Sequence, residues 1–148
     1  MSNASRQAGC VFCLAVENPD QPDSLVIHRG THNFVIINRY PYNNGHIMIA
    51  PYLHISNPVD SDAATLEEMM RLFQRGITAL RDSYEPDGFN MGMNLGKCAG
   101  AGIEAHYHLH LVPRWLGDTN FMTALADIRV IPEDFSVTIA KLKPHFSV

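Results

Sequence analysis

The stretch HYHLHLV at residues 106–112 decides how this chain is interpreted. Side chains alternate between the two faces of a β-strand, so a strand here would carry its three histidines on one face. Tyr107, Leu109 and Leu111 would then point the other way, toward the core. Such a row fits three interpretations: a polar surface strand, a metal site or a covalent catalyst with one nucleophilic imidazole. A metal site is among them because imidazole is a common zinc ligand. Stacked histidines are a poor choice for a plain polar face, which favours the last two.

The segments around this stretch predict an α+β fold with a largely antiparallel sheet. Residues rich in β-branched side chains, bounded by turn signals, indicate strands. We expect these strands at 24–28, 34–38, 46–50, 89–94 and 106–112. Strands followed by a helix and then by more strands are typical of this fold class.

Two helices are predicted. The long one begins near Ser61, where Asp60 and Ser61 can cap its first amides. Apolar residues recur along it at helical spacing, so one face is expected to be buried. That face comprises Leu66, Met69, Met70, Phe73, Ile77 and Leu80. A short C-terminal helix is expected from about 132 to 142.

Composition indicates one globular domain over residues 1–148, with 1–9 as a flexible N-terminal segment. Hydrophobic residues make up 46% and charged residues 18%, which argues against disorder. The formal net charge of -4 disfavours a general nucleic-acid binder. No apolar run is long enough to span a membrane, and the N-terminus lacks the apolar core of a signal peptide. We therefore expect a cytoplasmic protein without nucleic-acid or membrane partners.

Cys10 and Cys13 are separated by two residues. In a reducing compartment this spacing indicates a metal site or a redox pair more than a structural disulfide. A metal site needs further ligands, and the chain has eight histidines to supply them.

These motifs together resemble the histidine triad (HIT) superfamily. HYHLHLV is similar to its signature, and NRYPYNNGHIMIAP at 38–51 resembles its strand–loop–strand segment. PRWLGDTNF at 113–121 is similar to the bacterial branch that includes diadenosine tetraphosphate phosphorylases and hydrolases. The resemblance covers about residues 10 to 121. It implies a HIT-like fold: a five-stranded antiparallel sheet, one long helix and a short C-terminal helix, commonly paired as a homodimer.

The resemblance also implies roles for the histidines. The middle one, His108, would attack the α-phosphorus of a nucleotide and form a nucleotidyl-imidazole intermediate. His110 would lie near the phosphate. This chemistry is reasonable in itself, because neutral imidazole is a good nucleophile near pH 7 and the phosphorylated product is labile.

A structural zinc site is implied in the same way. Some relatives carry a ligand just past the third strand, and the first triad histidine completes the set; here the four residues are Cys10, Cys13, His54 and His106. Four protein ligands leave no open position, so the ion would stabilise the fold and not activate water. The alternative is that the ion is absent and His54 is an ordinary exposed residue.

The nucleotide pocket is expected around the loop at 94–105, which is rich in glycine and alanine and lets backbone amides approach phosphate. The candidates for binding nucleotide and phosphate are Asn38, His46, Asn94, Gly102 and Glu104. Relatives often have Ser, Thr or Gln near Gly102, so this chain offers only main chain there. Glu104 is either a phosphate-orienting group or a solvated charge.

Three other residues near the motifs are less specific. Trp115 is either a core residue or a cover for the nucleotide. Lys97 and Arg114 are the cations nearest to the expected path of the leaving phosphates.

The predicted function is cleavage of a dinucleoside polyphosphate, in particular diadenosine tetraphosphate, through a His108 intermediate. The segment at 113–121 favours phosphorolysis over hydrolysis. Hydrolysis of nucleoside phosphoramidates is an alternative within the same chemistry. A nucleotide-binding regulator with little turnover is an alternative of another class.

Overall fold

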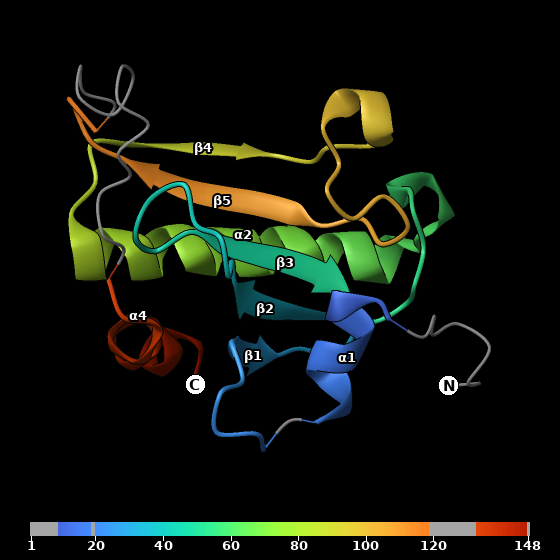
Figure 1. The fold of residues 1–148 in the computed structure, drawn as a ribbon, viewed down its shortest axis with the longest axis horizontal. Coiled ribbons are helices and arrows are strands. Elements are labelled where there is room, and N and C mark those ends of the chain that lie inside the picture. Colours follow the sequence, from blue (N-terminus) through green and yellow to red (C-terminus); the bar gives the residue numbers. More distant parts are fainter. Residues whose placement is uncertain (1–8, 19, 119–132, 148) are drawn as a thin grey trace.

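The computed structural model describes residues 9–18, 20–118 and 133–147. Residues 1–8 of the expected flexible segment at 1–9, the end of the motif at 119–121 and the start of the C-terminal helix at 132 lie outside the described residues. Within them, five strands form one antiparallel sheet in the order β1-β2-β3-β5-β4 (Figure 1). The strands are β1 (Val26–Arg29), β2 (Asn33–Ile37), β3 (Ile47–Pro51), β4 (Gly88–Gly92) and β5 (Leu109–Arg114). The α+β prediction is confirmed.

Helices flank this sheet. The long α2 (Ala63–Tyr84) runs behind it, and α1 (Val11–Glu17) and α4 (Phe135–Leu142) lie near opposite ends of the sheet on the β1 side (Figure 1). Single turns of 3-10 helix occur at η2 (Pro58–Asp60), η3 (Lys97–Ala99) and η4 (Lys143–Phe146). The long and C-terminal helices were predicted from the sequence, but α1 was not.

The strand predicted at 106–112 was placed too early, because it begins at Leu109. Its ladder with β3 pairs residues 47–49 with 109–111. Before that ladder, the backbone N–H of Tyr107 donates to the carbonyl of Ile55 at 2.9 Å, a residue beyond the end of β3. The alternation of faces nevertheless holds, since Tyr107, Leu109 and Leu111 are buried in the core.

The predicted cap of the long helix was also wrong. Asp62 is the N-cap, and its carboxylate accepts a hydrogen bond from the backbone N–H of Thr65 at 2.8 Å. Asp60 ends the preceding 3-10 turn. The hydroxyl of Ser61 bonds instead to that of Tyr107 at 2.6 Å, which links the helix entry to the histidine stretch.

The buried face of α2 differs from the prediction. Leu66 and Met70 are 36% and 49% exposed, whereas Gly76 and Ala79 are buried. A Cβ at Gly76 would lie 3.1 Å from both Ile47 and Leu111, so the glycine lets the helix approach the sheet closely. Small residues are not counted by an apolar pattern, and the predicted face was therefore rotated about the helix axis.

The side chains of functional interest lie on the sheet face opposite α2. Cross-strand pairing aligns Ile36, Met48, His110 and Gly92 in one row across β2, β3, β5 and β4. Their sequence neighbours Ile47 and Leu111 point to α2. The sheet therefore has a helix-covered face and a second face, here called the open face.

Candidate active site and metal centre

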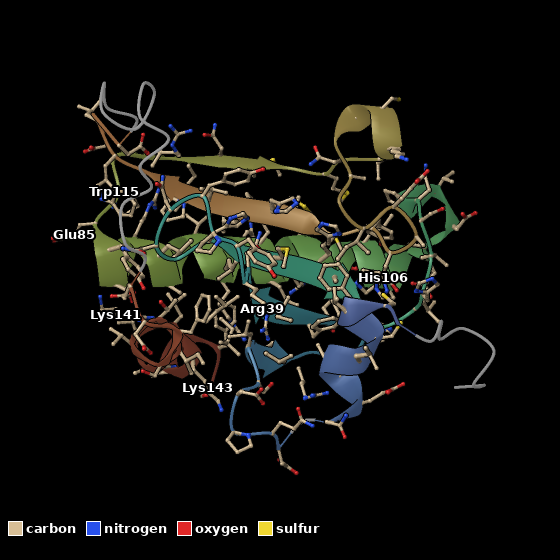
Figure 2. The ribbon with its side chains drawn as sticks, viewed as in Figure 1. Arg39, Glu85, His106, Trp115, Lys141 and Lys143 are labelled. Carbon is tan, nitrogen blue, oxygen red and sulfur yellow. The ribbon has the colours of Figure 1, made fainter. Side chains whose placement is uncertain are left out.

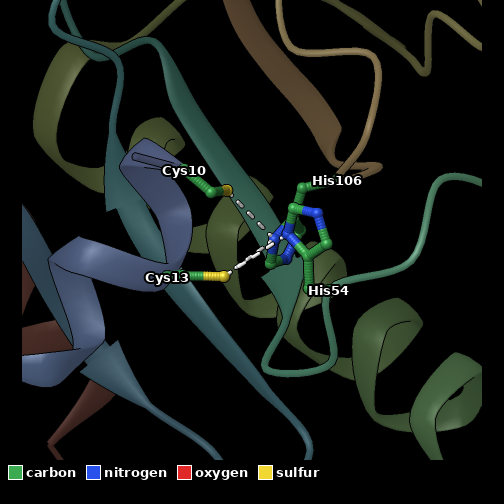
Figure 3. Close-up of side chains that lie close together, drawn as sticks. All are labelled: Cys10, Cys13, His54 and His106. Atoms are coloured by element: carbon green, nitrogen blue, oxygen red, sulfur yellow. Dashed lines mark hydrogen bonds between the residues drawn. The ribbon is translucent and has the colours of Figure 1, made fainter. Parts of the chain in front are cut away.

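The structure brings four predicted metal ligands together at one end of the sheet (Figure 3). Cys10 caps α1 and Cys13 lies within it, whereas His54 follows β3 and His106 precedes β5. Their ligand atoms all lie within 4.8 Å of one another. A cysteine sulfur approaches a histidine Nδ1 at 3.4, 3.5 and 3.7 Å in three of the pairs.

These separations fit a tetrahedral ion. Zinc–sulfur bonds near 2.3 Å and zinc–nitrogen bonds of 2.0–2.1 Å place neighbouring S and N ligands about 3.6 Å apart. Two thiolates and two imidazoles are a common donor set for zinc. The Cys10–Cys13–His54–His106 cluster can therefore hold a metal ion.

The backbone orients His106 as a ligand. Its Nε2–H donates to the carbonyl of Pro51 at 2.8 Å, which leaves the Nδ1 lone pair facing the sulfurs. The residue is fully buried, and burial lowers its pKa to about 4. The imidazole is neutral near pH 7, as a metal ligand must be.

His108 has the opposite ring orientation. Its Nδ1–H donates to the carbonyl of His106 at 2.9 Å, so Nε2 carries the lone pair. Burial lowers the pKa of His108, which is 7% exposed. The ring lines a cavity on the open face. A neutral, oriented imidazole with its lone pair available is equipped for nucleophilic attack.

His46 and His110 form a hydrogen-bonded pair beside His108. The backbone N–H of Tyr42 donates to Nδ1 of His46 at 3.2 Å, which places the His46 proton on Nε2. That N–H faces Nδ1 of His110 at 2.9 Å. His110 must then carry its own proton on Nε2, where it can donate to a ligand. One backbone amide thus sets two tautomers in series.

Both rings of this pair are neutral near pH 7. Burial, with contributions from His110 and His108, lowers the pKa of His46 to about 3. Burial and the neighbouring His108 lower the pKa of His110 to about 4. Protonating either ring would place a charge beside another imidazole in a buried site.

A cavity of about 770 Å³ opens beside His108 and His110. Of the predicted nucleotide-binding residues, Asn38, Asn94 and Gly102 line it. His46 lies beneath, fully buried, and contributes through His110. Glu104 is exposed and is not among the residues lining this cavity. The volume of the cavity is within the range of small-molecule sites.

Several residues at the cavity were not predicted from the sequence. Phe12 contacts both His106 and His108, and its ring centroid lies 5.2 Å from that of His106 and 4.7 Å from that of His108. Arg39, Tyr40 and Tyr42 are exposed side chains that line the cavity from the loop after β2. Their position directly after Asn38 in the 38–51 motif was the available signal.

The three less specific candidates, Trp115, Lys97 and Arg114, do not line this cavity. Trp115 lies at the opposite end of the sheet from His106 (Figure 2) and donates through Nε1 to the carbonyl of Tyr84 at 3.3 Å. It therefore packs against the end of α2. Lys97 is exposed in η3. Arg114 forms a bidentate ion pair with Asp118, at 2.6 and 2.9 Å.

Comparison with known proteins gives a consistent result. The HIT domain family model matches residues 19–115. The chain is 40% identical over 111 residues to an AP-4-A phosphorylase of Mycobacterium tuberculosis, an alignment that covers 75% of this chain and only 57% of that protein. It is 28% identical over 106 residues to Protein hit of Bacillus subtilis, covering 72% and 71% of the two chains.

Solved structures agree in fold. A Zn-bound histidine triad family protein from Mycobacterium smegmatis superimposes with a TM-score of 0.73 at 30% identity, over 94% of each chain. A hypothetical histidine triad nucleotide-binding protein from Sulfolobus tokodaii gives a TM-score of 0.75 at 21% identity, over 93% of this chain and 92% of that one. Within the described residues, no helix is long and apolar enough to cross a membrane.

Proposed function

Because this chain belongs to the histidine triad (HIT) family, we propose that it cleaves the phosphoanhydride chain of a dinucleoside polyphosphate, with diadenosine tetraphosphate as the first substrate to test. The observation that carries this proposal is the orientation of His108. Its Nδ1–H is held by the carbonyl of His106 and its ring lines a cavity large enough for a nucleotide.

The first step is attack of His108 Nε2 on the α-phosphorus. The new N–P bond replaces the bond from that phosphorus to the bridging oxygen, and the oxygen departs on the leaving nucleotide. His108 becomes a phosphorylated imidazolium that keeps its Nδ1 proton, so the carbonyl of His106 stabilises the developing positive charge. The Nε2–H of His110 donates to a phosphate oxygen.

The second step transfers the nucleotidyl group to an acceptor. Attack by inorganic phosphate breaks the N–P bond, releases ADP from an adenylyl intermediate and restores neutral His108. Attack by water releases AMP. The relative named as an AP-4-A phosphorylase favours phosphate as the acceptor, and hydrolysis of dinucleoside polyphosphates or phosphoramidates is the alternative.

The cavity residues take the remaining roles in this proposal. Asn38 holds the ribose hydroxyls, whereas Asn94 and the backbone at Gly102 contact phosphate. Glu104 contacts the phosphate only if the loop at 94–105 closes on a ligand, because its side chain is exposed. His46 keeps His110 in its donor tautomer.

We propose that the metal is a structural zinc ion held by Cys10, Cys13, His54 and His106. The donor set and the S–N separations support zinc, and four protein ligands leave no position for substrate. When bound, the ion would join α1 to the segment after β3 and to His106, two residues before His108.

We further propose a cytoplasmic homodimer. Reduced thiols at Cys10 and Cys13 suit a reducing compartment. The exposed Leu66 and Met70 on α2 offer apolar surface to a second copy. Light scattering of the purified protein would give the oligomeric state.

The decisive experiment is a timed incubation of diadenosine tetraphosphate with and without inorganic phosphate, using the wild type and His108→Ala. ADP plus ATP formed only with phosphate, and lost in the variant by about 10³-fold or more, supports phosphorolysis. AMP plus ATP without phosphate indicates a hydrolase. Tight nucleotide binding without turnover by the metal-loaded wild type would favour a regulator and overturn the proposal.

A further inference from the structure

A second groove lies on the open face, next to the cavity already described. It has a volume of about 510 Å³ and runs over β5 and β4. Three residues line both spaces: Tyr42, Asn94 and His110. His108 lines only the first. The row Met48–His110–Gly92 crosses from one space to the other, so His110 stands at their junction.

From this arrangement we propose that the groove over β4 and β5 binds the nucleoside of the leaving nucleotide. The inference rests on the proposed function and assigns it a second subsite. In an in-line displacement the leaving oxygen departs on the side of phosphorus opposite the nucleophile. With His108 in the first cavity and His110 at the junction, the polyphosphate passes His110 and Asn94 and its far nucleoside enters the groove.

The charges in the groove fit a nucleoside better than a free phosphate. The guanidinium of Arg114 is held bidentately by Asp118, and its Nη1 donates to Oδ1 of Asn90 at 2.7 Å. Asn43 donates to the same Asp118 carboxylate at 2.9 Å. The cation is thus compensated by a carboxylate inside the groove. Amide and carboxylate groups suit ribose hydroxyls and base edges, whereas a phosphate would meet the Asp118 charge.

Tyr42 adds a stacking surface at the junction. Its ring is 78% exposed and stacks on His46 with centroids 5.3 Å apart and an interplanar angle of 17°. One face of the tyrosine is therefore fixed against the histidine pair. The other face is available to a flat ligand, such as a nucleobase.

Gly92 offers a clean way to obstruct the groove. It lies opposite His110 in the β4–β5 ladder and lines the groove, and a Cβ placed there would meet no atom within 4 Å. Gly88 lies at the other end of the same strand, opposite Arg114, with equally open surroundings. It does not line the groove. Gly92→Val and Gly88→Val are a matched pair, since valine suits a strand at either position.

The test compares the affinities of AMP and of a non-hydrolysable diadenosine tetraphosphate analogue by calorimetry. We expect the wild type and Gly88→Val to bind the analogue at least about tenfold more tightly than AMP. In Gly92→Val this difference should disappear because only one nucleoside is held. Asn90→Trp, at an exposed position on the same face of β4, provides a second obstruction if Gly92→Val fails to fold.

Two outcomes would overturn the subsite. One is a wild type that binds AMP and the analogue equally. The other is a Gly92→Val variant that keeps the full preference for the analogue. Neither result affects cleavage at His108, which is read separately from product formation. Conversely, a wild type that prefers the analogue but forms no product would retain the subsite and reject the proposed activity.

Discussion

Two groups of histidines lie next to each other in this molecule and differ in what their lone pairs face. In the metal cluster, His106 turns Nδ1 toward two cysteine sulfurs and is fully buried. Two residues later, His108 turns Nδ1 toward a backbone carbonyl and leaves Nε2 beside a cavity. The residue type and the buried surroundings are shared. What differs is the ring nitrogen that donates to a backbone carbonyl, which is Nε2 in His106 and Nδ1 in His108.

The comparison teaches that backbone groups assign the roles. The Pro51 carbonyl makes His106 a ligand through Nδ1, the His106 carbonyl makes His108 a nucleophile through Nε2, and the Tyr42 amide makes His110 a donor. None of these partners depends on the identity of a side chain. A histidine pattern in sequence therefore shows that such a site exists before it shows which ring does what.

The largest expected effect tests the metal cluster. Cys13→Ala removes one of four ligands and should abolish stoichiometric metal binding. Structural zinc binding contributes on the order of 10 kcal/mol in small domains, so we expect the free energy of unfolding to fall by about 5 kcal/mol or more. Metal content and urea unfolding measure both quantities. Cys98→Ala is the control, because Cys98 is exposed and outside the cluster. Equal stability of the two variants would show that no metal supports the fold.

A second prediction concerns the residue between the two groups. Phe12 is buried and lies within 5.2 Å, centroid to centroid, of both His106 and His108. Phe12→Ala leaves a cavity and should cost about 3–5 kcal/mol of unfolding free energy. We also expect kcat to fall, because the His108 ring loses its packing partner. Leu14→Ala on the same helix, where the side chain is 47% exposed, should cost less than about 1 kcal/mol. A stable Phe12→Ala protein with full activity would show that the two groups are independent.

How far the sequence predicted this arrangement depends on the range of the contacts. The five strands, the long helix and the four clustered ligands followed from periodicity, spacing and family resemblance. Residues whose role depends on partners distant in the sequence could not be predicted in this way. Gly76 is buried because the sheet lies against it, and Asp62 rather than Asp60 caps α2 because Pro58 has already begun a separate turn.

Helix α1 shows the same limit more clearly. Its seven residues follow Cys10, and no side chain of that cap bonds the first amides. Short helices are marginal without packing. Here Phe12 and Cys13 are buried against parts of the chain about ninety positions away, and no local pattern records this.

A third prediction perturbs the His46–His110 pair and leaves the metal cluster unchanged. His46→Leu removes the Nε2–H that fixes the tautomer of His110. The proton of His110 can then move from Nε2 to Nδ1, where it no longer faces the phosphate. We expect kcat to fall by about 10- to 100-fold, as for loss of one positioned donor or its support, with KM little changed. The metal content should stay at the wild-type value, because His46 is not a ligand. His46→Gln, whose amide can donate at a similar reach, should recover part of the rate. Equal rates for the leucine and glutamine variants would mean that His46 only fills space.

The last prediction concerns how stability depends on pH. Burial holds the pKa of His46 at about 3 and that of His110 at about 4, below the ordinary value of 6.5. Between about pH 4 and 6.5 the unfolded chain binds protons on these rings and the folded chain does not. The free energy of unfolding should therefore be constant above about pH 7. Below pH 6.5 it should fall by at most about 1.4 kcal/mol per pH unit for each histidine.

Urea titrations from pH 4.5 to 8 measure this slope, and metal content determined at each pH separates it from loss of the ion. His46→Leu should show a shallower slope than the wild type, because one of the buried rings whose pKa is lowered is gone. A slope that persists unchanged in His46→Leu but vanishes in Cys13→Ala would place the acid sensitivity in the metal cluster. The metal cluster, and not the His46–His110 pair, would then limit stability at low pH.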